Sequence, residues 1–116
     1  MHNKILVVET DKAACDELET ILQEIAQEGG ELFFCDQKEE ALAIIKKEHP
    51  PVVLLEHTLF DKSWSQEGVR IIVTVPRGVN LPDGQEYLIK PFRSHQVLEK
   101  CRAYLTLEVV PPIPPM

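Results

Sequence analysis

Residues 4–8 read KILVV, residues 52–55 read VVLL and residues 71–75 read IIVTV. Each is a short, almost uninterrupted run of aliphatic residues, which is typical of a strand covered on both faces in a parallel sheet. Two further runs, ELFFC at 31–35 and YLI at 87–89, are the remaining predicted strands. Because helical segments separate the earlier runs, the sequence predicts an open, mostly parallel α/β sheet.

The first two connections have clear helix signals. The first predicted helix begins at Thr10 or Asp11 as its cap and ends at the glycine pair 29–30. A second helix is expected to begin at Asp36 as its cap and to end at the HPP run 49–51, since proline cannot continue a helix. Apolar residues recur at helical spacing in the first of them: Leu18, Ile21, Leu22 and Ile25.

Two later connections are unusually short. The third and fourth strands are joined by the 14 residues 57–70, and the fourth and fifth by the 10 residues 76–85. A parallel crossover with its helix needs at least about 10–12 residues. We therefore expect the third helix to be shortened to one or two turns around 63–67, and the fourth to be missing, with RGVNLPDGQ forming a loop. A last helix is predicted over about 94–104.

Length and composition predict one soluble domain. The chain has 116 residues, of which 44% are hydrophobic and 27% charged, and no apolar run approaches the ~20 residues that span a bilayer. Residues 1–105 form the predicted domain, and 106–116 an extra strand with a proline-rich tail or linker. No signal peptide is predicted. The three cysteines, without a C-x-x-C pair, are expected to be free thiols in a reducing cytoplasm: Cys15, Cys35 and Cys101.

The net charge of −7 is unevenly distributed. Residues 1–58 hold 13 acidic against 5 basic residues, whereas 59–116 hold 6 against 7. Because an acidic chain repels phosphate backbones and anionic lipids, direct binding to nucleic acid or to a membrane is not expected. The partner that this charge favours is a protein with a basic face. The six acids within 11–28 are interpreted either as a solvated face or as a docking surface.

Polar residues stand where the predicted strands end, and in an open α/β sheet the functional crevice lies outside those carboxyl ends. They are Glu9, Thr10 and Asp11 after the first strand, Glu56 after the third, Thr74 or Val75 after the fourth, and Lys90 after the fifth. Carboxylates that converge near a lysine can bind a hard divalent cation with an oxyanion beside it. The simpler interpretation is an ion pair between Glu56 and Lys90, with Glu9 and Asp11 acting at the helix start.

Three segments resemble, in matching order, the conserved blocks of response-regulator receiver domains: KILVVETD at 4–11, ALAIIKKEHPPVVLLEH at 41–57 and EYLIKPF at 86–92. The resemblance implies a flavodoxin-like, doubly wound, five-stranded parallel sheet in the order 2-1-3-4-5. It also implies an aspartate that accepts phosphate from a histidine kinase, an acidic pair for magnesium, a Thr/Ser and a Lys that sense the phosphoryl group, and a switch aromatic.

The implied site is eroded in this chain. Position by position, the phosphoacceptor falls on Glu56, the acidic pair on Glu9 and Thr10 with Asp11 beside them, the hydroxyl on Val75 or, with a slip of one residue, Thr74, the lysine on Lys90 and the aromatic on Tyr87. Glu56 carries one methylene more than aspartate, which moves its carboxylate roughly 1.5 Å outward. In-line phosphoryl transfer depends on positioning, so this displacement is serious. Thr10 removes one of the two magnesium carboxylates.

We therefore interpret the chain as a degenerate receiver, a non-enzymatic signalling module without a cofactor. Its expected partner is a protein: a histidine kinase, a phosphotransfer protein or an output domain. Only weak magnesium binding is expected, at Glu9, Asp11 and Glu56. One alternative is an active receiver that is phosphorylated atypically at Glu56 with magnesium. A lower-ranked alternative is a flavodoxin-type binder of a small ligand, which the absence of a glycine-rich loop after the first strand disfavours.

The missing fourth helix leaves one flank of a very apolar sheet to be covered. Phe60 and Trp64, the segment 105–110 and a second copy of the chain are the three candidates. We interpret the two aromatic residues as a cap on the core where a helix is lost. We also expect self-association at this flank, with residues 106–116 contributing to a homodimer.

Overall fold

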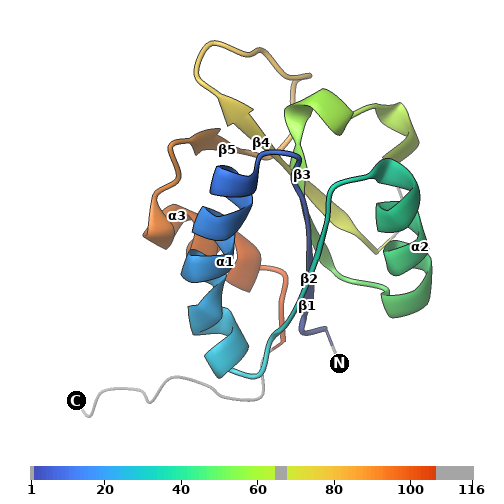
Figure 1. The fold of residues 1–116 in the computed structure, drawn as a ribbon, viewed down its shortest axis with the longest axis vertical. Helices are drawn as coiled ribbons and strands as arrows, with labels where there is room; N and C mark the ends of the chain where they lie inside the picture. Colours follow the sequence, from blue (N-terminus) through green and yellow to red (C-terminus); the bar gives the residue numbers. More distant parts are fainter. Residues whose placement is uncertain (1, 65–67, 107–116) are drawn as a thin grey trace.

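The chain folds into one parallel sheet between two helical layers, in a computed structural model that describes residues 2–64 and 68–106. Its elements are β1 (Lys4–Val8), α1 (Lys12–Gln27), β2 (Glu31–Cys35), α2 (Lys38–Glu48), β3 (Val52–Glu56), two 3-10 turns (His57–Leu59 and Lys62–Trp64), β4 (Arg70–Pro76), β5 (Tyr87–Lys90) and α3 (Ser94–Arg102). All neighbouring strands are parallel, in the order β2-β1-β3-β4-β5 (Figure 1). The predicted doubly wound, flavodoxin-like sheet is confirmed.

Alternation along the strands divides the core into two halves. Side chains of Ile5, Val7 and Leu54 pack with the helix residues Leu18 and Val97. The alternate residues of β1 and β3 pack with α2 on the opposite face: Leu6, Val8, Val53 and Leu55. Figure 1 shows α1 and α3 on one side of the sheet and α2 on the other. The continuously apolar strands are buried on both faces, which is why they lack an apolar–polar alternation.

The ends of α1 follow the sequence signals. Asp11 is the N-cap, and its carboxylate accepts a hydrogen bond of 3.3 Å from the Ala13 backbone N–H. The helix ends before Gly29, whose φ of 97° lies in the left-handed region that glycine adopts without steric cost. Both helix ends are therefore determined by local chemistry.

The predicted cap of α2 is wrong. Asp36 precedes the N-cap, which is Gln37, and Gln37 makes no side-chain capping hydrogen bond. Gln37 is still extended, with φ −132° and ψ 145°, so the helix begins one residue later than a cap at Asp36 requires. Its other end is as expected, because His49 adopts a left-handed φ of 52° immediately before the two prolines.

Both short connections differ from ordinary crossovers as predicted. Residues 77–86, all of them described, contain no helix, and Gly78 and Gly84 have φ values of 87° and 83°. The β3–β4 connection keeps only its two 3-10 turns, and part of the predicted 63–67 segment lies outside the described residues.

Trp64 replaces a helix as cover for the α2-side core. It is completely buried, and its indole N–H donates a 2.7 Å hydrogen bond to the Leu59 carbonyl oxygen. Phe60 is partly buried against the same core. The interpretation of these aromatic residues as a core cap is confirmed. The predicted extra strand and tail fall almost entirely on residues 107–116, outside the described part of the chain.

No helix within the described residues is long and apolar enough to cross a membrane.

Candidate functional site

A polar cluster lies at the carboxyl ends of the strands. Among the described residues, the buried polar side chains are Glu9, Glu56 and Thr74, with exposed fractions of 4%, 7% and 1%. Glu9 directly follows β1, and Glu56 is the last residue of β3, where it lies opposite Thr74 of β4. Lys90 ends β5. The parallel register thus brings together four residues that are far apart in the sequence.

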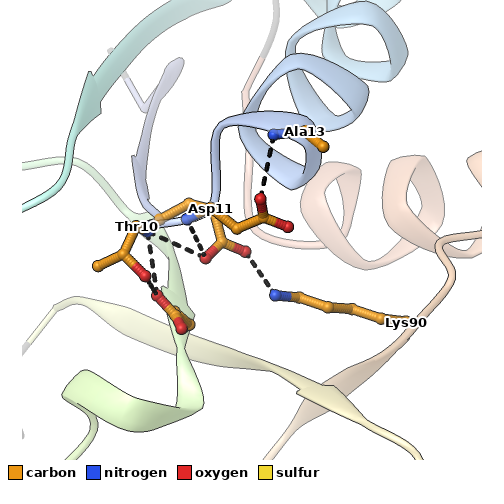
Figure 2. Close-up of polar contacts among 6 residues, drawn as sticks. Thr10, Asp11, Ala13 and Lys90 are labelled. Carbon is orange, nitrogen blue, oxygen red and sulfur yellow. Dashed lines mark hydrogen bonds and ion pairs between the residues drawn. The ribbon is translucent and has the colours of Figure 1, made fainter.

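Glu56 is bound by Thr10, the residue at the start of the turn into α1. Its Oε2 atom accepts a 3.0 Å hydrogen bond from the Thr10 backbone N–H and a second hydrogen bond from the Thr10 hydroxyl (Figure 2). Burial by itself raises the pKa of Glu56, but the hydrogen bonds to its carboxylate, those from Thr10 foremost and then those with Glu9 and Thr58, together outweigh burial and lower the pKa to about 2. Glu56 is therefore a fixed negative charge at neutral pH.

Glu9 is paired with Lys90, not Glu56 with Lys90. The Lys90 ammonium lies 2.8 Å from Glu9 Oε1, while the Thr10 N–H also donates 3.1 Å to Glu9 Oε2 (Figure 2). The predicted Glu56–Lys90 ion pair is wrong. The ammonium lies against the more deeply buried side chain of Glu9, and Thr10 supplies the donors for Glu56. Burial nonetheless raises the pKa of Glu9 above its ordinary value, because it outweighs the attraction of Lys90.

The alternation of side chains along β4 decides whether Thr74 or Val75 occupies the predicted hydroxyl position. Thr74 lies opposite Glu56 in the register, and its side chain is on the same face as that of Glu56. Val75 points to the other face and is 2% exposed. Thr74, not Val75, therefore occupies the hydroxyl position, and its Oγ1 atom has no hydrogen-bond partner within the described residues.

Two other predicted site residues lie apart from the cluster. Tyr87 is 48% exposed and shares its face with Val75, so it points away from the carboxylates. The Asp11 carboxylate is used at the N-terminus of α1, as its cap. Figure 2 shows the Asp11 carboxylate bound to the Ala13 N–H and not to Glu56 or Glu9.

The cluster does not fit a magnesium ion as it stands. Magnesium requires carboxylate and water oxygens in near-octahedral geometry. Here one Glu9 oxygen faces the Lys90 ammonium, and one Glu56 oxygen accepts both donors of Thr10. Within the described ranges, no group of three or more His, Cys, Asp or Glu side chains is arranged to hold a metal. The Lys90 ammonium thus pairs with a carboxylate that a magnesium ion would need, and the Thr10 hydroxyl stands in place of a second carboxylate ligand.

Thr10 is a hydrogen-bond donor to Glu56, a role that the sequence pattern does not indicate when each position is taken by itself. From the sequence, Thr10 is then only the loss of a carboxylate, and the extra methylene of Glu56 only a displacement of the acceptor. In the structure the two departures are complementary, because the Glu56 carboxylate meets the hydroxyl that replaces the acid. The sequence does contain a signal for this. Glu56 is longer than the implied aspartate, Thr10 is shorter than the implied acid, and the resemblance implies that these two positions are neighbours.

Several solved structures have a fold similar to that of this chain. A response regulator receiver modulated diguanylate cyclase from Pelobacter carbinolicus is 24% identical with a TM-score of 0.71, over 88% of this chain and 91% of that chain. A response regulator signal receiver domain from Bermanella marisrubri is 18% identical with a TM-score of 0.68, over 90% and 98% of the two chains. The N-terminal receiver domain of a two-component response regulator from Bacteroides fragilis is 15% identical with a TM-score of 0.65, over 87% and 94%.

No family model and no curated protein matches the sequence. The assignment therefore rests on the sheet order, the helical layers and these structural similarities, and it concerns the fold. The chain has the fold of response-regulator receiver domains.

Proposed function

We propose that this chain is a signalling module that acts by binding a protein partner and does not undergo a phosphorylation cycle. The observation that supports it best is the pair of hydrogen bonds from Thr10 to Glu56 Oε2. A phosphoacceptor carboxylate needs a free oxygen in line with the phosphodonor and a metal ion to neutralise the transferred group. Thr10 takes up one Glu56 oxygen and Lys90 pairs with Glu9, so the two carboxylates do not present the free oxygens that a metal ion beside the acceptor would need.

The proposed signalling state is permanent. Because Glu56 has a pKa of about 2, its charge does not change across the physiological range. Lys90, the residue implied to sense a phosphoryl group, is bound to Glu9. Regulation of such a module comes from the presence of its partner and not from a change at Glu56.

The expected partner has a basic surface. The outer face of α1 exposes Asp16, Glu17 and Glu19, and residues 1–58 carry 13 of the 19 acidic side chains. Complementary charge of this kind steers encounter between proteins and fixes their orientation. A histidine kinase, a phosphotransfer protein or an output domain with a basic face fits this surface.

Incubation with acetyl phosphate and magnesium, followed by intact mass measurement, tests the proposal. The wild-type chain should show no added phosphoryl group. The matched variant carries Thr10→Asp and Glu56→Asp together, which restores the second acid and shortens the acceptor. That variant should gain an adduct. A stoichiometric adduct on the wild-type chain that disappears in Glu56→Gln contradicts the proposal and favours the atypical phosphorylated receiver.

A further inference from the structure

β5 is exposed along its edge and on one face. It is one of the two edge strands of the sheet, next to the connection from which the helix is missing, and Figure 1 shows it at the sheet margin away from α2. The large hydrophobic side chains exposed among the described residues are Val79, Tyr87 and Ile89, at 38%, 48% and 42%. Two of the three belong to β5 and lie on the same face.

The backbone of β5 has hydrogen-bonding groups directed to the free edge. Val73 of β4 lies opposite Tyr87, and its N–H donates 3.0 Å to the Glu86 carbonyl oxygen. In a parallel ladder a residue bonds to the two residues that flank its partner, so Val73 bonds to the backbone groups of Glu86 and Leu88. The backbone groups of the residues that alternate with these along β5 point to the opposite side. It follows that the N–H and C=O groups of Tyr87 and Ile89, four in all, face away from β4.

Space for another strand lies beside this edge. A groove of about 810 Å³ runs along β5 and is bounded on its far side by Gln96, Lys100 and Tyr104 of the α3 region. A second cavity of about 340 Å³ lies on the helix-free face, where Val79 joins the two exposed β5 side chains. The same four-residue strand thus borders open space in two directions.

Within the described residues, β5 has one common protection of an edge strand, its short length of four residues. Natural edges are also guarded by a charged side chain, a bulge or a covering element. Lys90, the cationic residue of β5, is turned to the opposite face and paired with Glu9. Pro91 comes only after the strand has ended.

We propose that a second copy of this chain pairs with β5 along this edge, antiparallel, with the two-fold axis at Leu88. In this register Tyr87 of each copy lies opposite Ile89 of the other. The four outward groups of one strand then meet the same four groups of its copy, so every donor has an acceptor. An aromatic side chain also faces a β-branched one twice, which is a favourable cross-strand pair.

A second copy fits this edge because the edge is complementary to itself. A two-fold interface must present one patch that matches its own rotated image. The segment 87–89 presents such a patch. The backbone N–H and C=O groups of Tyr87 and Ile89 point to the free edge, and those of Leu88, between them, point to β4. The result is a continuous ten-stranded sheet, twice the five strands of one copy. This inference does not depend on whether Glu56 is phosphorylated.

Sedimentation of the full chain at micromolar concentration tests the proposal with two variants. The wild-type chain should be a dimer. Ile89→Pro removes one outward N–H, which a single edge strand tolerates but an added strand does not, so this variant should be a monomer. Val79→Lys changes the apolar face but not the edge, so it should remain a dimer. A monomeric wild-type chain, or a Val79→Lys variant that dissociates as completely as Ile89→Pro, overturns the proposal.

Cross-linking tests the register even if Ile89→Pro fails to fold. Opposed residues in the proposed pair have Cα atoms about 5.5 Å apart, which a disulfide spans. Equivalent residues lie diagonally, about 7–8 Å apart, beyond that reach. A mixture of Tyr87→Cys and Ile89→Cys chains should form a cross-linked dimer above the background of the parent chain, and either variant alone should not. Cross-linking of each variant with itself, or none in the mixture, overturns the register.

Discussion

At the scale of single residues, Lys90 compensates a carboxylate that would otherwise be buried alone. The Glu9 side chain is 1% exposed and that of Lys90 is 23% exposed. Removing one member of such a pair leaves an uncompensated buried charge, which is strongly destabilising, whereas removing both is much less so. The pair is therefore better tested as a cycle than by one substitution.

We expect Lys90→Met to lower the free energy of unfolding by about 2–3 kcal/mol, below the usual range for a fully buried pair because the lysine is partly exposed. Addition of Glu9→Gln to that variant should restore most of the loss. Urea denaturation at neutral pH measures both. The control is Lys12→Met, whose pair with Asp16 is exposed at both ends and should matter little. A double variant no more stable than Lys90→Met contradicts the pairing.

Glu56 makes the stability depend on pH in a defined direction. Its pKa is about 2 in the folded chain, against an ordinary value of 4.5. A carboxyl with a lowered folded pKa stabilises the fold above its unfolded pKa. That stabilisation is lost as the pH falls from about 4.5 to about 2.

Thr10→Val should therefore destabilise the chain most at neutral pH. The variant loses the hydroxyl donor to the Glu56 carboxylate, and we expect a decrease of about 1–2 kcal/mol at pH 7. The difference from wild type should shrink as the pH falls through the same window, in urea denaturation at a series of pH values. Thr20→Val is the control, since the Thr20 hydroxyl binds only a backbone carbonyl. A pH-independent effect of Thr10→Val contradicts the assignment.

At the scale of elements, the two aspartates that precede the first two helices have different roles. Asp11 caps α1 through the Ala13 N–H, whereas Asp36 lies outside the cap position of α2. Asp11→Ala should lower the free energy of unfolding by about 1 kcal/mol, the usual cost of losing an N-cap side chain. Asp36→Ala should have no comparable effect. Thermal or urea unfolding of the two variants compares them, and equal losses contradict the cap assignment.

The shortened β3–β4 connection shows how one side chain substitutes for an element. Two 3-10 turns cannot cover as much of the sheet as a full helix, and the buried Trp64 indole occupies that space. None of residues 77–86, which form the β4–β5 connection, is buried, so Tyr87 and Ile89 remain accessible. The first loss is compensated within the chain, and we propose that the second is compensated by a copy of it.

At the scale of the whole molecule, the charge distribution separates two surfaces. Residues 1–58 have 13 acidic and 5 basic side chains, and 59–116 have 6 and 7. The acidic half includes α1 and α2, whereas β5 and α3 belong to the nearly neutral half. Partner binding and self-association are therefore expected on different parts of the molecule.

Magnesium should leave the melting temperature of the wild-type chain almost unchanged. A ligand at a concentration equal to its dissociation constant stabilises a protein by RT ln 2, about 0.4 kcal/mol. That is about 2 °C in a domain of this size. Because both Glu9 oxygens and one Glu56 oxygen are already bound, we expect a smaller shift at millimolar magnesium. Differential scanning fluorimetry measures it, with the Thr10→Asp, Glu56→Asp variant as the positive control. A larger shift that Glu9→Gln removes contradicts this expectation.

Local patterns were sufficient for most of the architecture. The apolar runs predicted all five strands, and the length and composition of 76–85 predicted a missing helix. Thr10 or Asp11 and the glycine pair 29–30 predicted the ends of α1, and the structure selects Asp11 as the cap. These features depend on residues adjacent in the chain, so local chemistry decides them. The absence of a cap at Asp36 is the exception, because a shift of one residue in a helix start is beyond what the pattern specifies.

The sequence by itself determined that Glu9, Glu56 and Lys90 lie at one edge of the sheet, since strand ends in a parallel sheet coincide. Only the tertiary structure decided which of them bind one another. Two glutamates with the same chemistry compete for one ammonium, and the outcome depends on burial and on the Thr10 turn. The choice of Thr74 over Val75 likewise followed from strand register, because a shift of one residue reverses the face of every side chain.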